Sequence, residues 1–209
     1  AARRLERPVK WIGTRSDVLL GDGQGRDQTV EAELALDADG KFTGLRWTAY
    51  HNVGAYIVGS GAVAILFSLK LAQTVYDIPS VGVESSAVFT NTPPTVPYRG
   101  NGRPEAVYIM ERLVDAAARE MAIDPAEIRR RNFIQPDQMP FTTKTGWTYD
   151  TGDYAAALDK NLSQSDWEGF EHRQSVSAAA GKQRGRAVAY YVDNTGIFNE
   201  RMEIRFDPS

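Results

Sequence analysis

Two arginines lie in a glycine loop at the predicted start of a helix, in the segment PYRGNGRP that begins at Pro97. The first N–H groups of a helix have no partner within it, so this end carries partial positive charge and suits an anion. Glycines let the backbone approach a ligand closely, and Arg99 adds a permanent, forked donor for phosphate, carboxylate or an oxo group. The pattern also fits a strand-to-helix turn in which Arg99 forms a structural salt bridge, and the residues alone leave both interpretations open.

The other candidate motifs favour structural roles. A dinucleotide-binding loop needs a strand before it and a helix after it, whereas GDGQG at 21–25 is followed by a predicted strand, so we interpret it as a glycine-rich hairpin turn. His51 and His172 are far apart in the sequence and have no nearby second ligand, so no metal site is predicted from this chain. The three arginines at 129–131 fall in the last turn of a predicted helix, where cations favour the dipole, and we expect a solvated helix end.

The composition is that of a globular chain without a nucleic-acid or membrane signal. Of 209 residues, 42% are hydrophobic and 24% charged, and the net charge of −3 gives no basic footprint for nucleic acid. No apolar run approaches the roughly 20 residues that span a bilayer. The chain has no cysteine, which excludes a disulfide or an iron–sulfur site built from it and fits a reducing compartment, so we expect a cytoplasmic location.

The elements that would position the Arg99 loop occur in blocks, which favours an α+β fold with β-hairpins and a mixed sheet packed against two to three helices. The blocks are a strand-rich part at 8–91, a helical part at 104–165 and returning strands at 185–207. Alternation and turn residues predict a hairpin at 28–51, with its turn at 37–40. Single strands are predicted at 7–15, 81–91, 185–193 and 199–207. Residues 53–80 are interpreted as a buried loop or short helix.

The helix that begins at Pro104 has the strongest pattern, because apolar residues recur there at spacings of three and four. A second helix is predicted from Asp124 as its N-cap, with Glu127 completing a capping box. A third is expected to begin at Asp153, and a polar, weakly periodic stretch follows at 163–181.

The segment PYRGNGRPEAVYIMERLVDAAAREMAIDPAEIRRRNFI resembles the large, molybdenum-binding subunits of the xanthine oxidase, aldehyde oxidoreductase and carbon monoxide dehydrogenase family. RPVKWIGTR, GRDQTVEAELALDADGKFTGL, YDIP and TGWTYDTGDY resemble the same family in matching order and spacing. The resemblance covers nearly the whole chain and is strongest to bacterial carbon monoxide dehydrogenase large chains.

This resemblance implies a molybdopterin cofactor, usually the cytosine dinucleotide form in bacteria. It implies that Arg99 is catalytic, beside the oxygen ligands of the metal, and that Arg99, Gly100, Asn101 and Gly102 form a cofactor-binding wall that faces the substrate. The implied reaction is oxidative hydroxylation of a small molecule, an aldehyde or an N-heterocycle. Electrons would leave through iron–sulfur and flavin subunits or domains.

Three departures from the family pattern narrow the range of expected substrates. Gly100 stands where carbon monoxide dehydrogenases have a copper-binding cysteine, which excludes a copper–sulfur–molybdenum centre. Asn101 stands where purine-oxidising members have an aromatic residue, and Phe67 where they carry an arginine that orients the purine. These departures argue against purines.

We expect the chain to be a central fragment of such a subunit, one piece at 1–209, inactive alone. Residues 1–6 have the pattern of the last turn of a helix, and the family's GGGFG loop and catalytic glutamate would lie upstream of Ala1 and beyond Ser209. Apolar surface at the cut ends could drive self-association. Two alternatives remain: a non-catalytic module that contacts partner subunits, and a nucleotide binder that uses Gly21 to Gly25.

Overall fold

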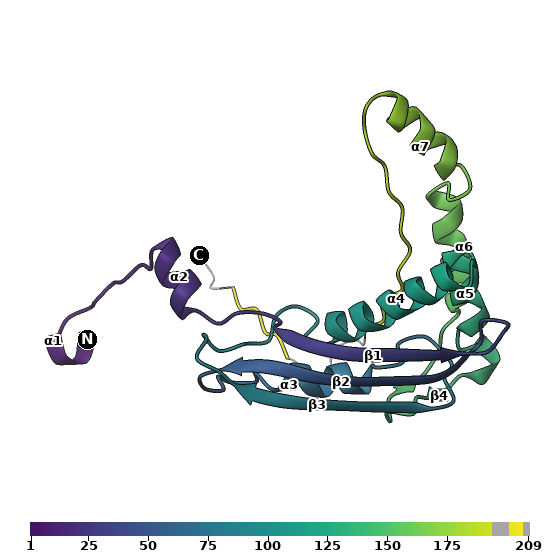
Figure 1. Cartoon of the computed structure of the whole chain (residues 1–209). Coiled ribbons are helices and arrows are strands. Elements are labelled where there is room, and N and C mark those ends of the chain that lie inside the picture. Colours follow the sequence, from purple (N-terminus) through teal and green to yellow (C-terminus); the bar gives the residue numbers. More distant parts are fainter. Residues whose placement is uncertain (194–200, 207–209) are drawn as a thin grey trace.

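The computed structural model describes residues 1–193 and 201–206, and its centre is a three-stranded sheet (Figure 1). Strands β1 (Gln28–Leu36) and β2 (Phe42–Gly54) form an antiparallel hairpin, and β3 (Val81–Phe89) pairs in parallel with β2. Residues of β1 alternate between half-buried and exposed, which is the period of a sheet with one covered face. The hairpin and the third strand are as the sequence predicts, and the α+β class is confirmed.

The hairpin turn at 37–40 is held by its own polar groups. The Asp37 carboxylate accepts hydrogen bonds from the backbone N–H groups of Asp39 and Lys41, each at 2.9 Å. Gly40 has φ 80°, a left-handed conformation that glycine adopts without the steric cost of a Cβ. The Asn132 side chain donates to the Gly40 carbonyl and accepts from the Phe42 N–H, both at 2.8 Å, so it ties the turn to the helical layer.

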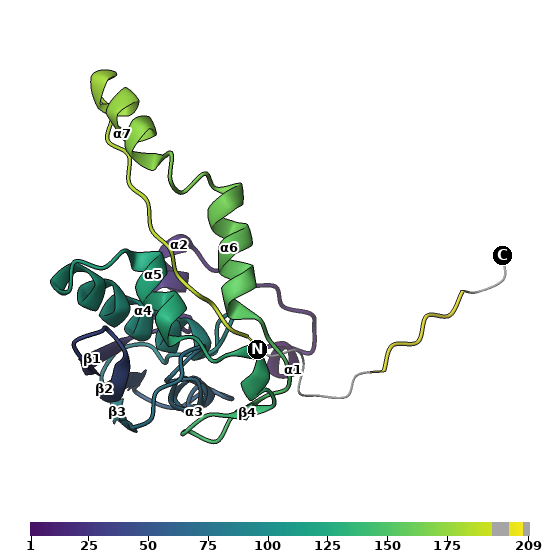
Figure 2. The same cartoon turned by 90° about the vertical axis from the view of Figure 1, so that its right-hand side faces the viewer.

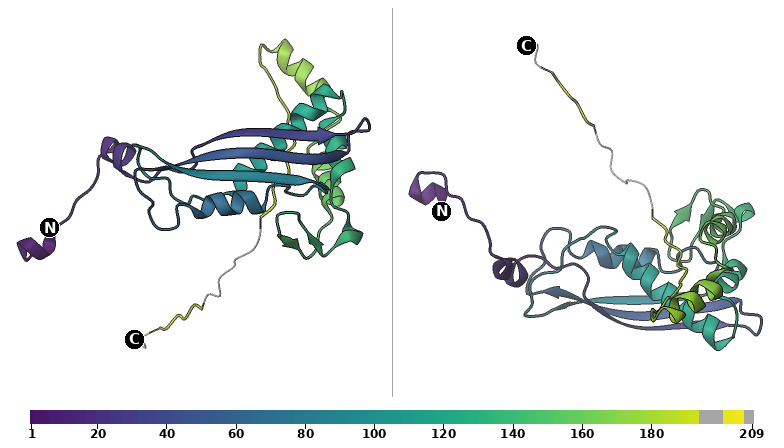
Figure 3. Two further views of the ribbon diagram at one scale, coloured as in Figure 1. Left: turned by 60° about the horizontal axis from the view of Figure 1, so that its bottom comes forward. Right: turned by 90° about the horizontal axis from the view of Figure 1, so that it is seen from above.

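Two helices lie side by side against one face of the sheet (Figure 3). They are α3 (Val63–Lys70), inside the segment interpreted as a buried loop or short helix, and α4 (Arg103–Glu120), the helix with the strongest pattern. The core between the sheet and these helices contains large side chains of β2, α4 and the 71–78 turn, among them Trp47, Leu45, Met110, Val114, Tyr76 and Ile78. Within the described residues, no helix is both long and apolar enough to cross a membrane.

The next helices begin at the predicted caps. In α5 (Pro125–Asn132), the Asp124 carboxylate accepts from the N–H groups of Ala126 and Glu127, at 2.8 and 3.1 Å. Glu127 binds Arg131 at 2.9 Å, so only one half of the predicted capping box is seen. The predicted third helix is α6 (Tyr154–Gln164), which Asp153 caps. Three short elements lie between α5 and α6: η1 (Pro136–Gln138), β4 (Phe141–Thr142) and β5 (Thr148–Tyr149).

The three arginines of α5 do not form the solvated helix end that the sequence suggested. The Arg129 side chain is 0% exposed and forms ion pairs with Glu111 and Asp115 of α4, both at 2.8 Å. Arg130 and Arg131 are partly exposed and bind acidic side chains at the surface. Arg129 faces α4 because it shares the inward side of α5 with the buried Ile128 and Asn132.

The strand predicted at 7–15 is wrong. The N-terminal segment has a helical turn, α1 (Ala2–Leu5), then extended chain, then α2 (Arg15–Gly21), and it leads away from the sheet (Figure 3). Thr14 and Asp17 form a reciprocal capping box that starts α2. Trp11 and Ile12 are 76% and 74% exposed, because residues 7–15 pair with no strand of the described sheets.

The C-terminal prediction also fails. A helix that was not predicted, α7 (Phe170–Ala179), follows α6 and projects with it from the body of the molecule (Figure 2). Phe170 is its one buried residue, which explains why no apolar period marks it. The strand predicted at 185–193 does not form. Of the strand predicted at 199–207, residues 201–206 are described and are not a strand, and residues 199, 200 and 207 lie outside the described part of the chain. Residues 185–193 instead run over the helical layer, where the Tyr190 ring packs on Phe133.

Candidate functional site

The loop at 97–103 joins extended chain to the first turn of α4 through three consecutive left-handed residues. Gly100, Asn101 and Gly102 have φ of 84°, 39° and 92°. A Cβ at Gly102 would lie 2.0 Å from the Ala64 carbonyl oxygen of α3, so glycine is required there by contact as well as by conformation. The side-chain oxygen of Asn101 is buried without a hydrogen-bond partner among the described residues. The loop is thus pressed against α3 and presents an unsatisfied amide oxygen.

The two arginines of this loop have different environments. Arg99 is exposed, and its side chain forms no ion pair with any acidic residue of the described part of the chain. Arg103 is mostly buried: it binds Asp193 at 2.6 Å, donates to the Gly100 carbonyl at 3.1 Å and lies 4.4 Å from the Phe67 ring centroid. Arg103 therefore holds the loop together, and Arg99 remains directed to the surface.

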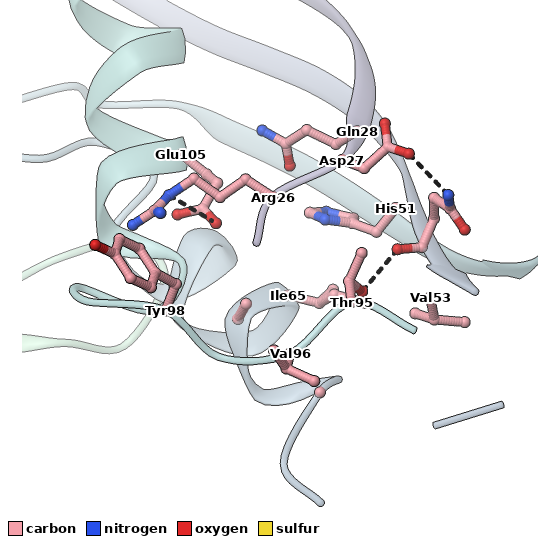
Figure 4. Close-up of a pocket in the computed structure, with 13 residues that line it drawn as sticks. Arg26, Asp27, Gln28, His51, Val53, Ile65, Thr95, Val96, Tyr98 and Glu105 are labelled. Carbon is pink, nitrogen blue, oxygen red and sulfur yellow. Dashed lines mark hydrogen bonds and ion pairs between the residues drawn. The ribbon is translucent and has the colours of Figure 1, made fainter. Parts of the chain in front are cut away.

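A cavity of about 20 Å³ lies behind the loop, between the sheet and the first turn of α4 (Figure 4). That volume suits one water molecule. Polar side chains dominate its lining, which includes Arg26, Gln28, His51, Thr95, Tyr98 and Glu105. One oxygen each of Gln28 and Glu105 is buried without a partner among the described residues, so the cavity lining holds unsatisfied hydrogen-bond acceptors.

His51 is 8% exposed on β2 and its ring lies 3.4 Å from the Ser85 hydroxyl. Burial lowers the pKa of His51, and the Glu105 carboxylate opposes that shift. The folded state therefore binds fewer protons than the unfolded state just below the usual His pKa of 6.5. The contribution of neutral His51 to the free energy of unfolding is therefore fully present above about pH 6.5, and it is lost as the pH falls through the lowered pKa of His51.

We expect urea unfolding to show a fall in stability below about pH 6.5 that His51→Gln removes. The charged groups that face His51 are Glu105, Arg26 and Asp27 around the cavity. His172→Gln, at an exposed position of α7, is the matched control and should keep the wild-type pH profile. Parallel pH profiles for wild type and His51→Gln would contradict the prediction.

The glycine-rich segment at 21–25 is not the hairpin turn that the sequence suggested, because α2 and not a strand precedes it. Its chain runs beside the extended segment before the Arg99 loop: the Gln24 N–H donates to Pro94 at 2.9 Å, and the Val96 N–H donates to Gln24 at 2.8 Å. In the sequence, the glycines that allow this contact are its one local signal. Residues 1–193 and 201–206 contain no cluster of three or more His, Asp and Glu suited to a metal ion.

The comparisons with known proteins agree on one family. The model of the molybdopterin cofactor-binding domain matches residues 1–133. The chain is 38% identical over 178 residues to the carbon monoxide dehydrogenase large chain of Hydrogenophaga pseudoflava, covering 84% of this chain and 22% of that protein. It is 32% identical over 199 residues to the nicotine 6-hydroxylase large subunit of Paenarthrobacter nicotinovorans, covering 94% and 24%.

Solved structures give the same result. Quinoline 2-oxidoreductase from Pseudomonas putida 86 superposes with a TM-score of 0.79 at 36% identity, over 86% of this chain and 23% of that one. The chain spans about a quarter of the length of the relatives it matches. A family model that covers most of the chain, with relatives above 30% identity, shows that it belongs to the molybdopterin cofactor-binding domain family.

Proposed function

We propose that residues 1–209 form one wall of the cofactor site in a molybdenum hydroxylase large subunit. The observation that carries the proposal is the loop from Arg99 to Gly102. It presents an exposed guanidinium, which has no ion pair among the described residues, beside three left-handed residues just before α4. The loop lies within the matched residues 1–133. We propose Arg99 as the catalytic residue of this wall, and Arg99, Gly100, Asn101 and Gly102 as its cofactor-binding residues.

The donor set of the loop supports an anionic pterin cofactor. Neighbouring protein atoms occupy the Cβ positions of Gly100 and Gly102, so these two glycines let the loop pack tightly against the protein in one conformation. The Asn101 oxygen needs a donor, which pterin N–H groups provide, and Arg99 offers a fork of N–H donors for phosphate or oxo groups. When bound, the molybdenum cofactor supplies the centre that accepts electrons from the substrate. The chain's own part is to hold this anion and to keep positive charge at one side of it.

Arg99 has the properties of an electrostatic catalyst. A guanidinium stays charged at every working pH, so Arg99 needs no proton transfer to stabilise negative charge that develops on a reacting oxygen. Arg103 and the close contact between Gly102 and α3 fix the loop before any substrate binds. Such preorganisation makes a fixed charge more effective than it is in water.

The relatives and the loop support the proposed substrate class. The named relatives act on carbon monoxide, nicotine and quinoline. We propose oxidative hydroxylation of an aldehyde or an N-heterocycle, because Gly100 offers no thiolate for copper. The cytosine dinucleotide form of molybdopterin, and electron transfer to iron–sulfur and flavin partners, complete this proposal; relatives are named as large chains or as complex subunits.

Cofactor content tests the proposal. We expect the whole polypeptide that contains residues 1–209 to retain pterin and molybdenum, and the 209-residue chain alone to retain neither, because it supplies one wall only. In the whole polypeptide, Gly102→Ala should lower pterin content several-fold, since the new Cβ would displace the loop from α3. Pterin fluorescence after oxidation and elemental analysis measure both quantities.

Gly146→Ala is the matched control, because Gly146 also has a positive φ, 81°, but a Cβ there meets nothing within 4 Å. It carries the same backbone cost without the clash, so its pterin content should equal that of the wild type. Stoichiometric molybdenum in the 209-residue chain would contradict the single-wall proposal. Equal pterin content in the two glycine variants would remove the loop from the cofactor site.

A further inference from the structure

The glycine-rich segment before β1 lies against the chain that leads into the Arg99 loop. A Cβ at Gly23 would be 2.6 Å from a methyl of Val96, and one at Gly25 would be 3.2 Å from the Cβ of Tyr98. A side chain at Gly23 would therefore push the two segments apart, and one at Gly25 would make the contact with Tyr98 tight. The segment is fixed along the loop that the proposed function uses, although it lies more than 70 residues away in the sequence.

Arg26, which follows this segment, contacts both ends of the loop. Its Nη2 donates to the backbone carbonyl of Arg99, before the three left-handed residues. Its Nε lies 3.5 Å from the Glu105 carboxylate in the first turn of α4, after them. The guanidinium is also 5.3 Å from the Tyr98 ring centroid. One side chain therefore contacts both ends of the loop, and Figure 4 shows Arg26 between Tyr98 and Glu105.

We propose that Arg26 is a positioning residue that fixes the backbone of Arg99 relative to α4, with Glu105 as its anchor. Glu105 is 8% exposed, so its side chain is enclosed by the protein, and Arg26 has φ 52°, a conformation that non-glycine residues rarely adopt. Gly100 and Gly102 are the first and last residues of the left-handed run, and glycine gives an unbraced loop many alternative conformations. The brace selects one of them.

Arg26 affects the proposed site by holding the backbone of Arg99 in position. Arg26 touches the Arg99 carbonyl and not its side chain, so it contributes no charge to the ligand-facing side directly, and its own charge is offset by Glu105. Losing the brace should misplace the Arg99 guanidinium while leaving it present. A purely structural ion pair would change the stability of the fold but not the position of Arg99, and the two possibilities predict different results. The effect on turnover rests on the proposed function; the effect on the loop does not.

The test is Arg26→Gly in the whole polypeptide, because glycine accepts φ 52° and leaves a space of guanidinium shape. We expect amide hydrogens at 97–103 to exchange about tenfold faster, with exchange in β3 unchanged. The kcat per bound pterin should fall about tenfold or more, since misplacement by about 1 Å costs up to a hundredfold. Millimolar guanidinium should restore both protection and kcat, and methylammonium, a cation without the fork, should restore neither.

Arg46→Gln is the matched control, because Arg46 forms an exposed ion pair with Glu33 on β1 and β2, away from the loop. It should leave exchange at 97–103 and kcat at wild-type values. Unchanged exchange at 97–103 in Arg26→Gly would overturn the brace, whatever the activity. Faster exchange that guanidinium reverses, with kcat unaltered, would support the brace and contradict the role of Arg99 in turnover.

Discussion

Replacing Arg129 with methionine is expected to lower the free energy of unfolding of the chain by about 3–5 kcal/mol. The guanidinium is fully buried and donates to Glu111, to Asp115 and to the Pro125 carbonyl, each at 2.8 Å. Methionine fills much of the same volume, so the loss comes from electrostatics more than from a cavity. Removal of the cation leaves Glu111 buried and uncompensated, which costs more than the ion pair itself contributes.

Tyr76 adds to that cost. Its hydroxyl donates to the second oxygen of Glu111 at 2.6 Å, and burial, reinforced by that carboxylate, raises the pKa of Tyr76 well above its ordinary value. Tyr76 thus stays a neutral donor and cannot replace the lost cation. We expect Glu111→Gln to recover part of the stability in the Arg129→Met background, because it removes the orphaned charge.

Urea unfolding followed by circular dichroism measures these differences, and the adjacent residue supplies the control. Arg130 binds Asp159 and Glu127 with its side chain 36% exposed, and exposed ion pairs contribute about 0–1 kcal/mol. Arg130→Met should therefore cost less than about 1 kcal/mol. Equal losses from Arg129→Met and Arg130→Met would contradict the buried-cage explanation.

These two arginines also show what local sequence resolves. Adjacent residues with the same side chain have opposite environments, because neighbouring positions on a helix face directions about 100° apart. The inward stripe of α5 that contains Ile128 and Asn132 was available in the sequence and identifies Arg129 as inward-facing. What was missing was its partners, Glu111 and Asp115, which lie on another helix.

Local signals predicted the elements that local interactions stabilise. The 37–40 turn, the Asp124 and Asp153 caps and the apolar stripe of α4 each act within a few residues, and each is present. Strands at 7–15 and 185–193 failed because a strand needs a sheet edge, which no local pattern guarantees. The Arg99 loop was recognised from its residues, but its brace was not, since the contact between Arg26 and Arg99 joins residues 73 positions apart.

Arg99→Ala is expected to lower kcat per bound molybdenum by about 100-fold or more, with little change in stability. The side chain is exposed and has no ion pair among the described residues, so its loss removes no packing, and surface substitutions of this kind change stability by about 0.5 kcal/mol or less. A group that stabilises charge in the transition state and not in the bound substrate lowers kcat more than it raises KM. Steady-state kinetics on the whole polypeptide, normalised to molybdenum content, measure this split.

Two further variants separate charge from geometry. Arg99→Lys keeps the cation but loses the planar fork, so its kcat should lie between those of wild type and Arg99→Ala. Arg112→Ala removes an exposed arginine on α4 outside the loop and should leave kcat unchanged. A wild-type kcat in Arg99→Ala would exclude Arg99 from the mechanism. Full kcat in Arg99→Lys with a low value in Arg99→Ala would assign the effect to charge alone, because the lysine ammonium supplies the same charge without the bidentate geometry.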